Sequence, residues 1–383
     1  MLQAGLSGSQ GNAAPAASNG LDEEQIAGLA AEYGLGKVQD VVAAPLGWSR
    51  VAKHQRNFLV EAGRSKVIFR FDDRRGDIEV KREVDLFLYL RKHGFPCPQP
   101  IPDRKSRHFR AVGGARLTAY KNIDGRRPAV ADLSPGQIEG VGRILGELHL
   151  VCKGYKKGIE NRFTFEKVAD LYAEVRPELP SYFRRFTRAL DEEVEYLGDF
   201  LEAKLPRGVI YGDLLSENVL LKGDKLVGIV GFDAVCRGKF IFDLATAVNA
   251  VCFVNGSYDL KRFETVIGGY EANRTLSLAE WDSFPNELRF SAFRFTVTKL
   301  REILAFRNGP SYLSLISEER LPPLSKDPRV VALHGFQEFF DRLSILRRER
   351  DGGMDSLLLA MATGYDYRRY QKVKAVGRRA RQA

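Results

Sequence analysis

The chain has 383 residues, of which 44% are hydrophobic and 28% are charged, and its formal net charge is +10 at pH 7. This length and composition predict a soluble globular protein with a core large enough for two lobes. The longest apolar stretch, at residues 241–254, contains Asp243 and Asn249. It is shorter than the roughly 20 residues that cross a bilayer, so we expect a buried helix there and no membrane partner.

Targeting signals and cysteines both favour a cytoplasmic protein. No Lys or Arg precedes Lys37, which argues against a secretory signal. The cysteines follow neither a CxxC nor a zinc-site spacing, and they predict buried free thiols in a reducing compartment. They are Cys97, Cys152, Cys236 and Cys252.

Most of the net charge lies near the end of the sequence. Residues 367–383 carry seven Lys and Arg side chains and no acid, so +7 of the +10 belongs to this tail and +3 to the rest. A basic tail with interspersed tyrosines can neutralise phosphates and stack on bases. The more common role of such a segment is a solvated end, so nucleic acid is expected as a partner only through this tail.

The first third of the chain predicts a small β-rich lobe. After a low-complexity segment, a short helix is expected from Asp22 to Tyr33, and apolar spacing predicts an amphipathic helix over 77–94 that ends at Gly94. In this helix Ile78 is expected to share the apolar face with Val84. In this lobe strands are expected at residues 41–47, 57–63, 65–71 and 115–123. The first three are expected to be consecutive and antiparallel.

Helices dominate the remainder of the chain. Ser134, Pro135 and Gln137 form a helix start with a capping box, and Ser277 with Glu280 forms another. Further helices are expected from Pro180 to Ala203 and from Phe242, and strands at 209–211, 219–222 and 226–232. The fold class is therefore α+β and bilobal. The predicted segments are a disordered 1–20, an N-terminal lobe 21–121, a C-terminal lobe 122–347 and an extension 348–383.

One segment contains the candidate catalytic residues. In "VIYGDLLSENVLL", residues 209–221, Asp213 follows a predicted strand and Asn218 comes five residues later. Phosphoryl transfer needs a carboxylate that takes the proton of the acceptor hydroxyl and oxygen ligands that hold magnesium. The alternative is a structural turn in which the Asp and the Asn have no chemical role.

The ordered series "YGDLLSENVLL", "GIVGFDAVCRG" and "FDLATAV" resembles the H-G-D-x-x-x-x-N, I-D-F and D-L-A motifs of the aminoglycoside phosphotransferase and choline kinase superfamily. "FPCPQPI", "DLATAVNAVCF" and "KDP" look most similar to its homoserine kinases. The resemblance spans about 22–347. It implies a protein-kinase-like fold, ATP and Mg²⁺ as cofactors, and a small hydroxyl-bearing acceptor such as homoserine. It also implies that Asp213 is the catalytic base and Asn218 a metal ligand.

Two positions depart from that family pattern. Tyr211 replaces the histidine before Gly-Asp, where a packed ring and a bonded hydroxyl can brace the loop. Gly231 stands where the magnesium aspartate belongs. Asp233 would share its face if the strand continued, but about 6.6 Å further along. A bulge or slip at Gly231 would let Asp233 act as the metal ligand.

The resemblance assigns further residues to the nucleotide and to the loop. Arg70 would contact the α- and β-phosphates, with Glu83 as its ion-pair partner, although each alone can equally be a solvated surface residue. Asp243 would bond the backbone of the catalytic loop, and His149 is expected to be a packed core imidazole. The remaining candidates lie in the phosphate-covering segment and the hinge: Arg50, Lys53, Asn57 and Tyr120.

Three functions remain open from the sequence. The first is an ATP-dependent phosphotransferase that acts on a small hydroxyl compound. The second is a pseudokinase that keeps the fold and serves nucleotide binding or regulation. The third is a nucleic-acid-associated protein that acts through its basic tail. No pattern in the sequence sets the oligomeric state.

Overall fold

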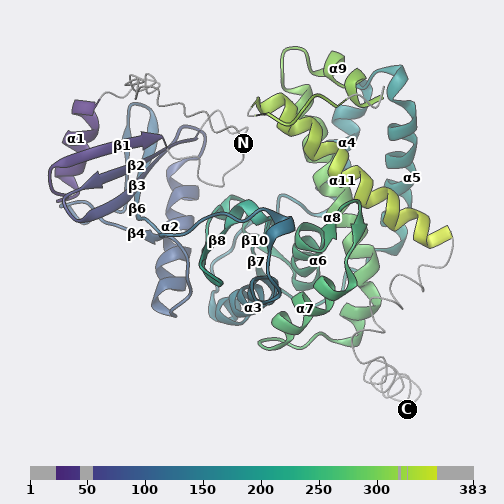
Figure 1. Ribbon diagram of the computed structural model, residues 1–383, viewed down its shortest axis with the longest axis horizontal. Helices are drawn as coiled ribbons and strands as arrows, with labels where there is room; N and C mark the ends of the chain where they lie inside the picture. The colour runs from purple at the N-terminus through teal and green to yellow at the C-terminus, as the bar shows by residue number, and fades with distance from the viewer. Residues whose placement is uncertain (1–22, 44–54, 318–320, 326, 352–383) are drawn as a thin grey trace, which may run out of the picture. The chain divides into compact units, whose positions relative to one another are not determined.

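The computed structural model describes residues 23–43, 55–317, 321–325 and 327–351 (Figure 1). These residues form two compact units. The sheet unit contains the described residues up to Asp77 together with 100–122. The helical unit contains 78–99 and the described residues from Ile123 onward. The sequence grouped 21–121 in one lobe, so the structure places residues 78–99 differently.

The sheet unit is built on a six-stranded sheet with the order β1-β2-β3-β6-β4, and β5 pairs with β6. Neighbouring strands β1/β2, β2/β3, β3/β6 and β5/β6 are antiparallel, as predicted for the first three. The strands are β1 (Val38–Ala43), β2 (Gln55–Ala62), β3 (Ser65–Asp72), β4 (Gln99–Pro100), β5 (Phe109–Val112) and β6 (Ala115–Lys121).

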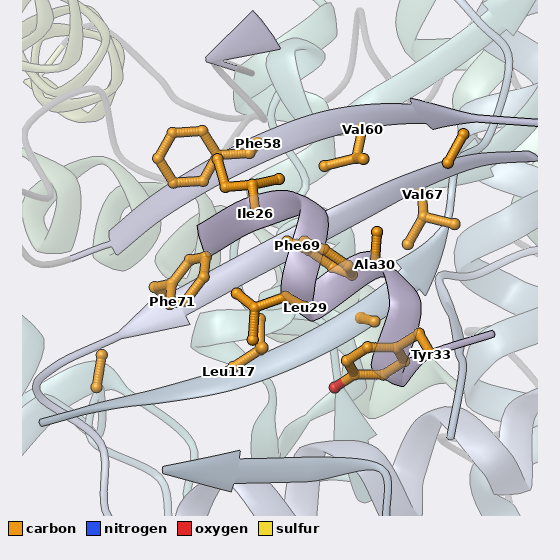
Figure 2. Packing of buried hydrophobic residues seen from close by; sticks show 13 residues of the cluster. Ile26, Leu29, Ala30, Tyr33, Phe58, Val60, Val67, Phe69, Phe71 and Leu117 are labelled. Carbon is orange, nitrogen blue, oxygen red and sulfur yellow. The ribbon is translucent and has the colours of Figure 1, made fainter. Parts of the chain in front are cut away.

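One face of this sheet is covered by α1 (Glu23–Glu32) (Figure 2). The helical spacing 26, 29, 30 and 33 places four apolar side chains on one stripe, which packs on alternate residues of the strands. The buried cluster includes Ile26, Leu29, Ala30, Tyr33, Phe58, Val60, Val67, Phe69, Phe71 and Leu117. The helix predicted at 22–33 is confirmed.

The amphipathic helix α2 (Asp77–Lys92) is also confirmed, and Gly94 follows it with φ +79°. It buries Val80, Glu83, Val84, Leu86, Phe87 and Leu90. The expectation for Ile78 was wrong: its side chain is 68% exposed, because the buried stripe begins only at Val80.

The helical unit contains three short antiparallel strand pairs: β7 (Arg207–Ile210) with β10 (Cys236–Lys239), β8 (Val219–Lys222) with β9 (Lys225–Ile229), and β11 (Phe253–Val254) with β12 (Ser257–Tyr258). Its helices are α3 (Pro135–Val151), α4 (Phe165–Val175), α5 (Arg184–Phe200), α6 (Phe240–Val251), α7 (Leu260–Glu271), α8 (Leu278–Leu304), α9 (Gly309–Tyr312), α10 (Ser314–Ser317) and α11 (Pro328–Asp351).

Both predicted helix starts with a capping box are confirmed. Ser134 and Gln137 form the capping box of α3, and Ser277 and Glu280 form that of α8. Helix α6 is buried along nearly its whole length and packs on α8, which also packs on α11 (Figure 1). Among the described residues, no helix combines the length and apolar character that a membrane span needs.

Some predicted bounds were wrong. The first strand begins at Val38 rather than at residue 41, because it pairs with β2 from Ala62 onward and is bulged after Val38. The rest of the predicted 41–47 strand lies outside the described residues from 44 on. The long helix begins at Arg184 rather than at Pro180, since a 3₁₀ turn over Ser181–Phe183 precedes it. The four cysteines are buried free thiols, as predicted.

Candidate active site

The candidate catalytic loop begins where β7 ends at Ile210. Gly212 has φ +78°, and a Cβ there would lie 2.7 Å from the carbonyl oxygen of Ala234. Only glycine fits this conformation and this close approach. The amide of Leu215 then donates to the carbonyl of Asp213 at 2.7 Å. This tight turn holds the Asp213 carboxyl at the end of the strand.

The Asp213 carboxyl lies among polar side chains and keeps 31% of its side-chain surface exposed. Asn218 Nδ2 donates to the Asp213 carbonyl at 2.8 Å and lies 3.5 Å from its Oδ2, while Arg294 Nη1 lies 3.3 Å from Oδ1. Burial raises the pKa of Asp213 to about 6, opposed by Arg294 and Lys299 and assisted by Glu217. A carboxylate with this pKa is a suitable base near neutral pH.

Asn218 carries an oxygen that the protein does not use. The residue is 1% exposed, and its Oδ1 has no hydrogen-bond partner among the described residues. A buried acceptor without a partner costs free energy, and an amide oxygen is a ligand that Mg²⁺ accepts. The geometry therefore fits the predicted metal role of Asn218.

The segment after β9 has Gly231 at the position where the family pattern places the magnesium aspartate. β9 ends at Ile229, and Gly231 has φ +81° and ψ 53°, followed by a 3₁₀ turn over Phe232–Ala234. The strand therefore does not continue to Asp233. Within the part of the chain that the structure describes, no group of three or more His, Cys, Asp or Glu side chains could hold a metal ion.

The two departures from the family pattern touch each other. The Tyr211 side chain is buried, and its hydroxyl lies 2.9 Å from the Gly231 carbonyl and also contacts the Val230 carbonyl. Its ring meets Phe232 edge to face, with centroids 5.0 Å apart. Burial and then Asp213 raise the pKa of Tyr211, so the phenol stays protonated and donates. The prediction of a packed ring with a bonded hydroxyl is confirmed.

Asp243 on α6 binds the backbone of the loop, as predicted. Its Oδ2 accepts from the Tyr211 amide at 2.6 Å, and its Oδ1 accepts from the Gly212 amide at 2.7 Å. His149 on α3 binds Oδ2 through Nε2 at 2.9 Å, and Tyr270 binds its Nδ1 at 2.8 Å. One fully buried carboxylate thus fixes the residues just before Asp213.

The protonation of His149 follows from these partners. Burial lowers the pKa of His149 although Asp243 opposes the shift, so the ring is neutral. With Asp243 as an acceptor, the proton is on Nε2 and the Tyr270 hydroxyl donates to Nδ1. That hydroxyl in turn accepts from Arg274 at 2.9 Å. His149 is a packed core imidazole, as expected, but one that also positions the catalytic loop.

The predicted nucleotide residues of the sheet unit share one face. Arg70 pairs in register with Asn57 on β2 and with Thr118 on β6, and Tyr120 pairs with Ile68. Because side chains alternate along a strand, these residues point away from the face that α1 covers. Arg70 is 0% exposed, and the Oδ1 atom of Asn57 is buried without a partner in the described residues.

The other predicted nucleotide residues have different outcomes. Glu83 on α2 is 7% exposed, so the alternative reading of Arg70 and Glu83 as solvated residues was wrong. They belong to different units, and their ion pair stays a prediction. Arg50, Lys53 and the basic tail lie outside the described residues.

Sequence reasoning missed Arg294, which contacts Asp213 from 81 residues away. It lies on α8 in the run "RFSAFRFTV", and no spacing rule connects it with the loop. A signal existed: Arg294 is the one charged residue in the run 290–298, and a cation within such an apolar run has to meet a partner.

Known proteins are similar to this chain in sequence. The profile of the phosphotransferase enzyme family matches residues 48–274. The chain is 28% identical over 293 residues to the homoserine kinase of Methylobacillus flagellatus, covering 74% of this chain and 88% of the relative. It is 28% identical over 290 residues to that of a Caulobacter species, covering 74% and 87%.

Solved structures share the fold. An amicoumacin kinase in complex with AMP-PNP, Ca²⁺ and Ami aligns with a TM-score of 0.61 at 18% identity, and the alignment covers 84% of this chain and 94% of the other. A microcompartment-associated aminopropanol kinase aligns with a TM-score of 0.57 at 17% identity, covering 86% and 98%. The predicted α+β, protein-kinase-like fold is therefore confirmed.

Proposed function

Because the chain belongs to the phosphotransferase enzyme family, we propose that it transfers the γ-phosphoryl group of ATP to the hydroxyl of a small molecule. Homoserine is the favoured acceptor, since homoserine kinases are among the relatives that match most of this chain. The observation that carries the proposal is Asp213 with a pKa of about 6 beside Asn218, whose Oδ1 is buried and unused.

Asp213 is the proposed general base. The acceptor oxygen forms a bond to the γ-phosphorus, the bond from that phosphorus to the bridging oxygen breaks, and ADP leaves. The proton of the acceptor hydroxyl passes to the Asp213 carboxylate. Asp243 and Tyr211 hold the loop so that this carboxylate does not have to be ordered during the reaction.

Asn218 Oδ1 is the proposed protein ligand for Mg²⁺, and Asp233 is the remaining carboxylate candidate. Bound magnesium would supply neutralisation of the phosphate charge. For the nucleotide itself we propose the sheet face with Arg70, Asn57 and Tyr120. Glu83 would pair with Arg70, and the basic residues Arg50 and Lys53 would cover the phosphates.

A pseudokinase is the second candidate, and Gly231 is the observation that favours it. Without an aspartate at this position the site lacks one anionic metal ligand, which weakens the hold on the nucleotide phosphates. Such a protein would bind ATP and transfer its phosphoryl group slowly or not at all.

ATP binding tests what these two candidates share. We expect isothermal calorimetry to show ATP binding whose gain from Mg²⁺ is smaller than in a homoserine kinase that has aspartate at the position of Gly231. The reason is that Asn218 contributes an oxygen but no charge. In Asn218→Leu the magnesium effect should disappear while binding without magnesium persists. Absence of ATP binding in both conditions would rule out both candidates.

Substitution at Gly231 separates the two candidates. We expect Gly231→Asp to increase the rate of phosphoryl transfer, because it returns a negative charge to the metal site. The left-handed backbone at φ +81° tolerates Asp at a cost of about 1 kcal/mol. Gly231→Asn is the matched control, since it imposes the same backbone cost without the charge. If Gly231→Asp brings no gain and Asp233→Ala abolishes turnover, Asp233 is the metal ligand.

A further inference from the structure

Arg294 is a buried cation beside the proposed base. Its side chain is 4% exposed, and its Nη1 lies 3.3 Å from Oδ1 of Asp213. The guanidinium carbon lies 4.0 Å from the ring centre of Phe163 and 3.9 Å from that of Phe295. Two aromatic faces therefore hold the planar group in place.

The hydrogen bonding of Arg294 is poor for a buried arginine. Arg289, on the same helix, binds both carboxylate oxygens of Glu193, and Arg342 binds a main-chain carbonyl at 2.7 Å and a carboxylate at 2.6 Å. Within the described residues, the only hydrogen bond of Arg294 is the 3.3 Å contact with Asp213, and its Nε is buried without a partner. A guanidinium offers five N–H donors.

This arrangement calls for a second anion. Leaving a buried charge without acceptors is costly, and Asp213 is a weak partner because it offers a single contact at 3.3 Å and leaves Nε without an acceptor among the described residues. Lys299, also on α8, acts on Asp213 as well, but its ammonium is paired with Glu302 at 2.8 Å, so in the described part of the chain Arg294 is the cation that lacks a close acidic partner besides Asp213. The surroundings of the Asp213 carboxyl are therefore positive at Arg294.

We propose that Arg294 binds a carboxylate of the acceptor while Asp213 receives the acceptor's hydroxyl. The substrate class is then a short hydroxy acid in which a few carbon atoms separate the two groups, as they do in homoserine. Polycationic acceptors would meet charge of the wrong sign at Arg294. Arg294 lies outside residues 48–274, so the family profile does not assign it. The inference rests on the proposed kinase function and names its substrate class.

Two acceptors that differ only in the carboxylate test the proposal. Homoserine carries it, and 3-aminopropan-1-ol is the same molecule without it. In Arg294→Gln we expect kcat/KM for homoserine to fall by about 10- to 100-fold, the size of a lost charged hydrogen bond. The value for 3-aminopropan-1-ol should fall by a smaller factor, because this acceptor loses only the effect of Arg294 on Asp213. Equal losses for the two acceptors would overturn the proposal, because they would mean a role in shaping the loop.

Three additions keep the test decisive. Arg301→Gln removes a cation from an exposed position of the same helix and should leave both acceptors unaffected. If Arg294→Gln does not fold, Arg294→Lys takes its place, because it keeps the charge without the planar fork. Its kcat/KM for homoserine should still fall more than its kcat/KM for 3-aminopropan-1-ol. If no acceptor is phosphorylated, the proposed function fails, and calorimetric binding of the two acceptors decides the inference. Homoserine binding that is weaker in Arg294→Gln than in the unsubstituted protein supports the inference. The inference is overturned if neither acceptor binds, or if homoserine binds Arg294→Gln as tightly as the unsubstituted protein.

Discussion

Replacing Asp213 by Asn is expected to lower kcat by about 10²- to 10⁴-fold, because that is the contribution of a positioned general base. In the unsubstituted protein, log kcat should fall as the pH drops below about 6, where the carboxyl takes up a proton. Burial is the main cause of this high pKa of Asp213; Arg294 and Lys299 lower the pKa, and Glu217 raises it. In Asp213→Asn, log kcat should not show this fall below pH 6. Steady-state kinetics between pH 5 and 9 measures both effects.

Stability supplies the control for this substitution. The pKa of Asp213 lies above its unfolded value of 3.8, so the neutral form stabilises the fold and that stabilisation is lost as the pH rises through about 6. The neutral Asn removes the cost of a buried carboxylate at pH 8 but also the negative charge beside Arg294, so the melting temperature at pH 8 should change little. Glu217→Gln removes a carboxylate from the same loop and should leave kcat nearly unchanged. If Asp213→Asn kept its activity, Asp213 would not be the base.

Replacing Asp243 by Ala is expected to cost about 3–5 kcal/mol of the free energy of unfolding, the usual cost of breaking a fully buried charged network. The substitution leaves the Tyr211 and Gly212 amides and the His149 ring without their acceptor. Asp243→Asn keeps one carbonyl oxygen and should cost less. Urea titration followed by circular dichroism measures the difference.

A carboxylate in a different setting gives the comparison for Asp243. Asp259 caps α7 by accepting from the Arg262 amide at 3.0 Å, and its side chain is 45% exposed. Asp259→Ala should therefore cost only about 1 kcal/mol. Equal costs for the two aspartates would mean that the network around Asp243 adds nothing beyond a single cap.

Elements whose determinants lie close together in the sequence were predicted well. The capping boxes of α3 and α8 depend on residues three positions apart, and both were found. β5 was missed although Gly113 and Gly114, with φ +56° and +81°, form the two-residue turn that joins it to β6. A Gly-Gly pair between short apolar runs is a hairpin signal that was available.

Elements that depend on distant contacts could not be read from the sequence. The backbone role of Asp243 followed from an ordered motif series, so the sequence could suggest it. Arg294 belongs to no motif and reaches Asp213 only through the packing of α8. The grouping of residues 78–99 with the helical unit likewise depends on tertiary contacts, such as that of Phe87 with Phe232 at 4.8 Å.

The cover that α1 forms over the sheet has a consequence for any shortened version of the protein. A fragment trimmed to the family profile at residues 48–274 would lose both α1 and β1. Phe58, Phe69 and Phe71, now 5%, 0% and 1% exposed, would then face water as one apolar patch beside the unpaired edge of β2. Exposed patches and open edges of this kind promote aggregation, so such a fragment would be recovered from expression in insoluble form.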